Sequence, residues 1–297
     1  MQDQSSILDK IIQSKQMQDA TQFNPTEVVS NLFKNLSNKE RDILSKRFGL
    51  FDKGKQTLEQ IGNDYQITRE RIRQIEVGTI KKIKELNDFQ KQIESAEHNI
   101  LKLLENYGGI MEENHLIEEL LTYSEANPVN RQASLFIINN LLSDRLERIK
   151  QDNDFLYSWK LPSIPTEIMR LAISELVKLI ELENNLIETK KLLELFKSSD
   201  FFKVNRNQIL TTKLGTSESE LSDEEVDKII ISLLKISKKL DQNILDEWGI
   251  ASWQSIAPKR MSDKAYLILR RTGKPLHFNE ITDLINQGRY KEILKYF

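Results

Sequence analysis

The stretch of residues 57–83, TLEQIGNDYQITRERIRQIEVGTIKKI, constrains the fold of this chain more than any other. Thr57 followed three residues later by Gln60 has the form of a helix capping box, and Thr68 can cap a second helix start. Between these two starts, Gly62 suits the end of a first helix. The pattern predicts two short helices joined by a tight turn.

The second of these helices has two chemically different sides. At about 100° per residue, one side carries mainly apolar residues: Ile72, Ile75, Thr79, Ile83 and Leu86. The other side is mostly polar: Glu70, Arg73, Gln74, Val77 and Lys81. Arginine, glutamate and glutamine are side chains that pair with base edges, and the first turns of a second helix in a helix-turn-helix enter the major groove. The stretch therefore predicts a DNA-binding element.

The wider segment from Leu36 to Leu86 resembles region 4 of the bacterial sigma-70 family. The motifs ERDILSKRFGL, TLEQIG and TRERIRQIE stand in the order and spacing of that family and cover about a fifth of the chain. In the family, this module binds the minus-thirty-five element of a promoter and the flap of RNA polymerase. The resemblance therefore implies two partners, double-stranded promoter DNA and the core of bacterial RNA polymerase, the latter through its β flap.

The resemblance also implies roles for individual residues. Four would contact bases: Arg69, Glu70, Arg73 and Gln74. Six would contact or adjoin phosphates: Arg47, Thr57, Glu59, Thr68, Arg71 and Lys81. The chain departs from the family at Gln66, where glycine is common, and at residues 77–79, where small helix formers are usual. Because Val77 and Gly78 are poorer helix formers, the second departure weakens the helix just after its first turns.

Charge separates this segment from the rest of the chain. Residues 36–86 contain twelve Lys and Arg against eight Asp and Glu, whereas the whole chain of 297 residues has a net charge of −2. The remainder taken as a whole is therefore acidic, whereas this segment has a basic excess of the kind that attracts phosphates. The chain has no cysteine, no leader pattern at its start and no apolar run that could span a bilayer. We expect a cytoplasmic protein.

Two further helices are expected before this stretch, after a tail of residues 1–24 with a short amphipathic helix at 6–18. Asn24 and Pro25 form a favoured helix start, and Ser37 with Glu40 forms another capping box whose helix should stop at Gly49. Four short helices would thus complete a domain of residues 25–87. A complete sigma factor carries a larger aromatic-rich domain ahead of this module, and about two dozen residues precede it here. We expect that the protein does not open promoters alone.

The remainder predicts two winged-helix-like units and a partial third, so the fold class is mainly α with short β-hairpins. Each unit would contain three helices followed by a hairpin. In the first, the helices are expected at 88–106, 111–121 and 130–142 and the strands at 148–150 and 155–159. In the second, the helices are expected at 173–180, 188–196 and 226–236 and the strands at 238–245 and 248–253. The third repeats only the opening helices, at 262–270 and 278–285.

This repeated element resembles the HARE-HTH domain, a winged helix also found in the delta subunit of bacterial RNA polymerase. The segment WGIASWQSIAPKRMSDKAYLILRRTGKPLHFNEITDLI carries the resemblance best. The implied boundaries are 88–165 for the first unit, 166–257 for the second and 258–297 for the partial third. Either the chain is a fragment, or its last unit is incomplete and packs on the second.

Catalytic chemistry is not indicated. The three histidines, His98, His115 and His277, lie far apart without metal-ligand spacing, and the chain has no glycine-rich phosphate loop and no G-x-S-x-G motif. We therefore expect no enzyme activity, no cofactor and no metal. The acidic stretch SESELSDEEVD is interpreted as a linker or cap. The three tryptophans, at 159, 248 and 253, lie at or beside expected strand ends and should pack in small cores.

The third helix of the first winged-helix-like unit leaves two interpretations open. Asn130, Arg131 and Gln132 at its start could touch DNA. The following run at 135–138, LFII, is too apolar for a helix that lies freely in a groove, which favours contact with protein.

Three functions remain open at this point. The first is a sigma-like transcription factor that binds a promoter element and whose acidic units modulate polymerase. The second is a delta-like or anti-sigma-like protein that binds RNA polymerase without sequence-specific DNA binding. The third is a targeting subunit of a restriction or repair system, which would need a nuclease partner that this chain does not supply.

Overall fold

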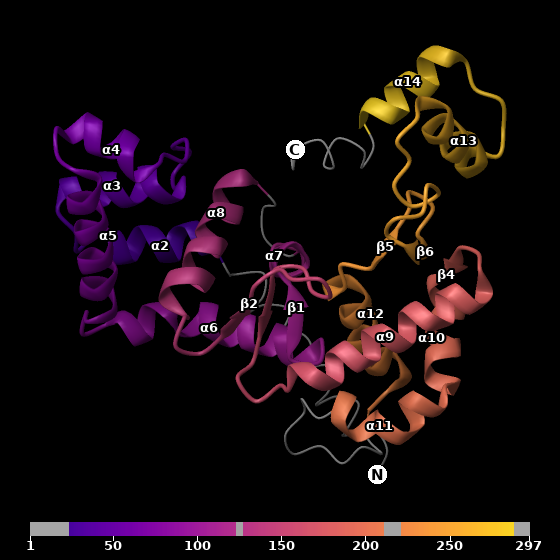
Figure 1. Cartoon of the computed structure of the whole chain (residues 1–297). Helices are drawn as coiled ribbons and strands as arrows, with labels where there is room; N and C mark the ends of the chain where they lie inside the picture. Colours follow the sequence, from indigo (N-terminus) through magenta and orange to yellow (C-terminus); the bar gives the residue numbers. More distant parts are fainter. Residues whose placement is uncertain (1–23, 123–126, 211–220, 288–297) are drawn as a thin grey trace, which may run out of the picture. The chain divides into compact units, whose positions relative to one another are not determined.

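The computed structural model describes residues 24–122, 127–210 and 221–287 (Figure 1). The described residues are mainly helical, with two small three-stranded sheets. They form two compact units, of which the first contains the described residues up to Glu105 together with Glu113–Glu147 and Lys160–Pro162. The short helix expected at 6–18 and residues 217–220 of the acidic stretch lie outside the described residues.

The first unit begins with four short helices, as the sequence predicts: α2 (Pro25–Phe33), α3 (Asn38–Phe48), α4 (Leu58–Tyr65) and α5 (Arg69–Lys84). The predicted caps are present. Asn24 caps α2, capping boxes open α3 and α4, and Thr68 caps α5. Helix α3 ends at Gly49, whose left-handed φ of 69° suits glycine. These helices form where they do because local side chains satisfy the backbone N–H groups at each helix start.

The end of α4 differs from the prediction. The helix continues through Gly62 to Tyr65, and Gln66 takes the left-handed position with φ 54°. Gly62 is needed for a different reason, because a Cβ atom there would lie 2.7 Å from the carbonyl oxygen of Ile67. The glycine therefore allows the connection to pass close to α4, while a glutamine adopts the conformation that usually favours glycine.

The first unit continues with α6 (Phe89–Asn106), α7 (Glu113–Leu120), α8 (Pro128–Phe136) and a turn of π-helix, η1 (Ile137–Leu141). Helix α8 packs against α2. The ring of Phe136 lies 5.8 Å from that of Phe33 and 5.0 Å from that of Phe48, and all but 1% of Phe136 is buried. Thr26 donates a hydrogen bond of 2.5 Å to Asn130 Oδ1. The four-helix module thus shares its core with α8.

The first sheet contains β1 (Ile110–Glu112), β2 (Glu147–Ile149) and β3 (Ser158–Lys160) in the order β1-β3-β2. Strand β1 occupies residues that were expected to begin a helix, so α7 starts only at Glu113. The strand expected from Phe155 is also shorter, because Phe155 bridges Ser237 and the Leu156 N–H donates to the carbonyl of Ile236 at 2.8 Å. Long-range pairing therefore replaces part of the predicted hairpin.

The second unit includes α9 (Thr166–Glu183), α10 (Thr189–Ser198), α11 (Asp200–Leu210) and α12 (Asp223–Ile236). Its sheet has the order β4-β6-β5, formed by β4 (Ile187–Glu188), β5 (Leu240–Gln242) and β6 (Glu247–Ile250). The hairpin of β5 and β6 confirms the predicted strand pair, and buried Trp159 and Trp248 confirm the prediction that they pack in cores. Helix α11 was not predicted.

The described part of the second unit ends with α13 (Met261–Thr272) and α14 (Phe278–Gln287). Gly273 ends α13 with φ 63°, and Ile268 packs with Ile285 between the two helices. Both helices were predicted. Within the described residues, no helix is long and apolar enough to cross a membrane.

Candidate nucleic-acid interface

Helices α4 and α5 are held together by a small apolar core. Ile43 of α3, Ile61 of α4 and Ile72 of α5 are fully buried and in contact. The N–H of Ile67 donates to the carbonyl of Gly62 at 3.0 Å, which closes the connection between α4 and α5. Farther along α5, Thr79 and Ile83 are also buried. The apolar side of α5 is therefore fixed to the unit, as the sequence predicts.

The opposite side of α5, called here the outer face, consists of Arg69, Glu70, Arg73, Gln74, Val77 and Lys81. All six side chains are exposed. The four residues expected to contact bases are therefore brought together on one solvent-facing surface in the first two turns of the helix. This is the arrangement that a helix needs to place polar groups against base edges.

Within α5, the polar side chains form two pairs. Arg73 donates two hydrogen bonds to the Glu70 carboxylate, from Nε at 2.9 Å and from an Nη atom at 2.7 Å, and Arg71 donates to Gln74 Oε1 at 3.1 Å. The hydrogen bond from Arg73 lowers the pKa of Glu70, and the same bond raises the pKa of Arg73. Exposed pairs of this kind contribute little free energy. These side chains can therefore leave their partners and bind a ligand instead at little cost.

The six residues expected near phosphates fall into different environments. Thr57 and Thr68 are helix N-caps whose side chains accept backbone N–H bonds, and Glu59 is exposed in the first turn of α4. Lys81 is 75% exposed, with its ammonium 3.7 Å from the Glu85 carboxylate. Arg71 is exposed beside the outer face.

Arg47 is the exception among these six. It is partly buried, its Nε atom lies 3.1 Å from Glu76 Oε2, and it also donates to the carbonyl of Gln56 at 3.5 Å. This side chain therefore ties α3 to α5. Its guanidinium serves the fold, and its removal would disturb the position of α5 as well as any phosphate contact.

A cluster around Asp42 joins α3 to α4. Its carboxylate accepts hydrogen bonds from Tyr65 at 2.6 Å and from Lys53, and lies 3.2 Å from Lys46. Burial would raise the pKa of Asp42, but the bonds from Lys53, Tyr65 and Lys46 outweigh it and lower the pKa to about 2. Burial and the bond to Asp42 raise the pKa of Tyr65 to about 12. Sequence reasoning missed this cluster because Tyr65 and Lys53 lie 23 and 11 residues from Asp42 along the chain.

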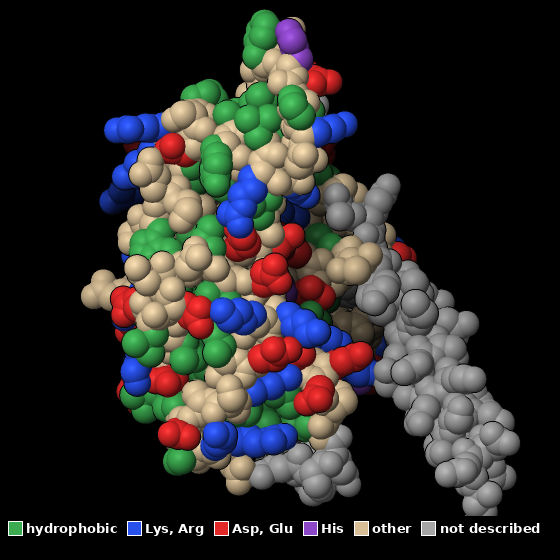
Figure 2. Space-filling view, turned by 90° about the vertical axis from the view of Figure 1, so that its right-hand side faces the viewer, with side chains coloured by type: hydrophobic (Ala, Val, Ile, Leu, Met, Phe, Trp, Pro, Cys, Tyr) green, Lys and Arg blue, Asp and Glu red, His purple; other side chains and the backbone are tan. Residues whose placement is uncertain are grey.

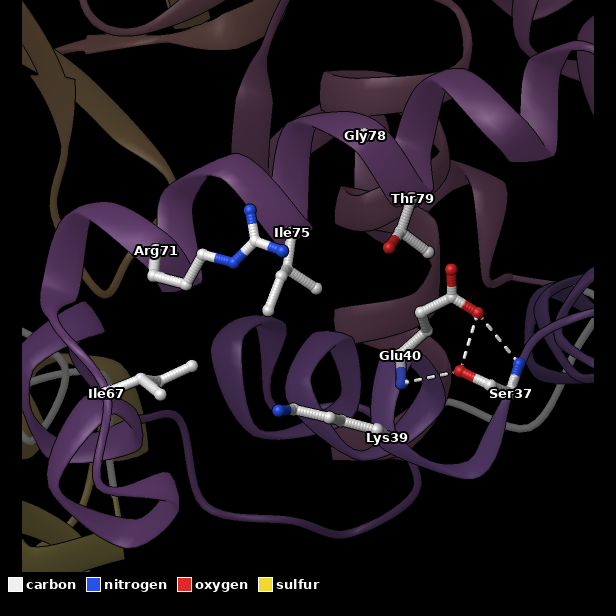
Figure 3. A pocket seen from close by; sticks show the side chains of 8 residues that line it. All are labelled: Ser37, Lys39, Glu40, Ile67, Arg71, Ile75, Gly78 and Thr79. Atoms are coloured by element: carbon white, nitrogen blue, oxygen red, sulfur yellow. Dashed lines mark hydrogen bonds between the residues drawn. The ribbon is translucent and has the colours of Figure 1, made fainter.

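A hollow of about 350 Å³ lies between the start of α3 and the flank of α5 (Figure 3). Arg71 and Gly78 line it from α5 and Lys39 lines it from α3. The Glu40 carboxylate accepts bonds from Ser37, chiefly from its hydroxyl, and these lower its pKa. It also pairs with Lys82 at 3.1 Å, outside the lining. The hollow thus has a basic rim beside the outer face of α5.

The start of α8 is not presented in the same way. Asn130 is buried against Thr26, and Arg131 donates a hydrogen bond to Asn114 Oδ1. The start of α12 in the second unit is acidic, with Asp223, Glu224 and Glu225 in its first turn. On the face drawn in Figure 2, Lys and Arg side chains are interspersed with Asp and Glu and do not gather into one basic patch.

The fold of α4 and α5 and the exposed polar surface of α5 define a helix-turn-helix module of the DNA-binding class. Comparison with known proteins specifies this module further. Residues 32–85 match the family model described as Sigma-70, region 4. The predicted resemblance of this segment to sigma-70 region 4 is thereby confirmed.

Similar proteins match over about a fifth of the chain. The RNA polymerase sigma factor SigA of Microcystis aeruginosa is 46% identical over 61 residues, which is 20% of this chain and 15% of that protein. SigA of Synechocystis sp. (strain ATCC 27184 / PCC 6803 / Kazusa) is also 46% identical over 61 residues, covering 20% of this chain and 14% of that protein. SigA of Lactococcus lactis subsp. cremoris is 42% identical over 69 residues, covering 21% and 19%.

Each of these similarities covers only about a fifth of this chain. The chain covers between 14% and 19% of the length of these three relatives. No solved structure matches the chain significantly. The resemblance of the later segments to HARE-HTH domains therefore stays a prediction. Among the described residues, no group of three or more His, Asp or Glu side chains could hold a metal ion.

Proposed function

We propose that residues 25–87 bind double-stranded promoter DNA sequence-specifically, with the first turns of α5 in the major groove. The observation that carries this proposal is the exposed outer face of α5 above a buried isoleucine side, within a segment that matches sigma-70 region 4. Arg69, Glu70, Arg73 and Gln74 would contact base edges. The target would be an element of the minus-thirty-five kind.

Phosphate contacts would position this helix on the duplex. Arg71 and Lys81 are exposed cations beside the base-contacting residues, and Lys39 adds a further cation across the hollow. Thr57, Glu59 and Thr68 lie at the starts of α4 and α5, where backbone N–H groups of a helix favour anions. Such contacts fix orientation but do not select sequence.

The second partner in this proposal is the core of bacterial RNA polymerase, contacted through its β flap. The relatives that match about a fifth of this chain are named RNA polymerase sigma factors, which supports this partner. The segments after residue 88 would be winged-helix units of the HARE-HTH type that modulate polymerase or a second factor. The net acidity of residues 88–257 favours contact with protein over contact with DNA for the first two units. Residues 258–297, with nine Lys and Arg against four Asp and Glu, do not share this acidity.

The test is selection of bound sites from random duplex DNA, with and without core polymerase. Arg73→Ala should relax sequence choice, at a cost of about 1–3 kcal/mol for the lost base contact. Lys81→Ala should weaken all sequences alike and reduce the salt dependence by about one unit of slope. Equal loss on selected and random DNA from Arg73→Ala would refute sequence recognition by α5. Arg47 is unsuitable for this test because it ties α3 to α5.

A second candidate function is a polymerase-associated protein of the delta-like or anti-sigma-like kind that does not bind DNA sequence-specifically. The acidic first turn of α12 and the acidity of the chain outside residues 36–86 favour it. This function predicts that core polymerase is bound with equal affinity by the wild type and by Arg73→Ala. It also predicts that no preferred sequence emerges from the selection.

A further inference from the structure

Val77 stands out on the outer face of α5 because it is the apolar member of that surface. Its exposed fraction is 55%, although the other side of the same helix is buried among isoleucines. Counted at about 100° per residue, it lies on nearly the same line as Glu70 and between the directions of Arg73 and Gln74. It therefore continues the surface of the expected base-contacting residues by one helical turn, about 5 Å along the axis.

The neighbouring Gly78 adds a second observation. A Cβ atom at this position would meet nothing within 4 Å, and Gly78 does not have a left-handed φ. Packing and backbone conformation therefore do not require glycine here, although glycine inside a helix costs about 1 kcal/mol relative to alanine. The missing side chain leaves open space at the position next to Val77 on the helix surface.

An apolar side chain between groups that bind base edges has a specific use in the major groove. Each thymine presents a C5-methyl group there, and small apolar side chains contact it. We propose that Val77 is a specificity-determining residue that packs on the C5-methyl group of one thymine in the bound DNA. This inference rests on the proposed function, because it needs α5 to lie in the major groove.

The experiment uses the full chain and a DNA site obtained by selection. Each thymine of the site is replaced singly by deoxyuridine, which lacks only the C5-methyl group, and affinity is measured at one salt concentration. For the wild type, one replacement should weaken binding about fourfold, the worth of one buried methylene-sized group. Val77→Ala should lose about the same factor on the thymine site and should be insensitive to that replacement.

Two controls make the outcome decisive. Val204→Ala removes the same atoms from an 81% exposed valine of α11 in the other unit and should behave as the wild type. Because Val77 is exposed, Val77→Ala should unfold like the wild type, within about 0.5 kcal/mol. The inference is overturned if no thymine is sensitive in the wild type, or if Val77→Ala keeps the same sensitivity. Arg73→Ala then separates the two proposals. If this variant relaxes sequence choice while no thymine methyl group affects binding of the wild type, only the role of Val77 is refuted. If the selection yields no preferred DNA site, both proposals are refuted.

Discussion

Helices α5 and α8 both follow a polar N-cap, Thr68 in one and Asn127 in the other, and both carry arginine in their first turns. In α5 these first turns face solvent, and the isoleucines beneath them form the core. In α8 the first turns face α2, where Asn130 is buried. A capped helix with a polar start is therefore not sufficient to present polar side chains to solvent. In α5 only the apolar side is buried by packing, so the polar side remains exposed.

The same comparison explains what α8 does. Phe136 at its end closes an aromatic cluster with Phe33 and Phe48, and Lys84 at the end of α5 pairs with Asp144 at 2.9 Å. The long-range contacts of α8 thus stabilise the module that presents α5. Helix α8 thus stabilises the first unit, while the polar side of α5 remains accessible to solvent.

Phe136→Ala has the largest expected effect and tests whether α8 stabilises the first unit. Removing a fully buried phenylalanine should lower the free energy of unfolding of the first unit by about 3–5 kcal/mol, because a cavity is left between α2, α3 and α8. Urea unfolding of the full chain, followed by a probe in the first unit, measures the loss. Val77→Ala on the outer face is the matched control, with an expected change within about 0.5 kcal/mol. Similar small losses for both variants would mean that α8 does not share the core.

Gly62→Ala should have the next largest effect. The added Cβ atom would lie 2.7 Å from the backbone carbonyl oxygen of Ile67, so the turn before α5 must shift, at a cost of about 1–3 kcal/mol. Gly78→Ala is the control, since the new atom meets nothing within 4 Å and should raise stability by about 0.5–1 kcal/mol. Thermal unfolding of the two variants distinguishes the positions, and shifts of the same sign would contradict this account.

Asp42→Asn should have a smaller, pH-dependent effect. The folded pKa of about 2 lies below the ordinary value of 3.8, so the carboxylate stabilises the fold fully above pH 4 and loses this contribution as the pH falls toward 2. The side chain is 28% exposed, and we expect a loss of about 1–2 kcal/mol at pH 7. Unfolding measured from pH 7 to pH 2 should show the difference from the wild type shrinking. A difference independent of pH would exclude the carboxylate as its cause.

Arg131→Ala should have the smallest effect on DNA. Its guanidinium bonds to Asn114 within the first unit, whereas Arg73 is exposed on α5. Affinity for the selected DNA and its salt dependence should match the wild type, as measured by titration at several salt concentrations. A loss of sequence choice from Arg131→Ala would instead give α8 a role at the groove.

The sequence predicts features of this fold that are set by local chemistry. The capping boxes at Ser37 and Thr57 and the two sides of α5 depend on residues three or four positions apart, and the structure contains all of them. It does not predict features set by distant contacts. Asn130 meets Thr26 across 104 residues, and the turn at Gln66 contradicts the usual preference for glycine.

The same distinction between local and distant contacts applies to the candidate site. The exposure of Glu70, Arg73 and Gln74 follows from helical periodicity, and the sequence predicts it. The partial burial of Arg47 depends on Glu76, which lies 29 residues away, and the pattern gives no sign of that ion pair. The missed helix α11 has exposed Val204 within it, which weakens the apolar periodicity by which helices are recognised.

The aromatic cluster has a practical consequence for anyone who wants to move this module into another protein. A fragment cut at the limits of the family match, 32–85, would leave the rings of Phe33 and Phe48 without Phe136 and facing water. Two uncovered phenylalanine rings on so small a domain favour aggregation over folding. A fragment that folds on its own must therefore be longer than the family match at residues 32–85. It must include α8 or an apolar helix in its place.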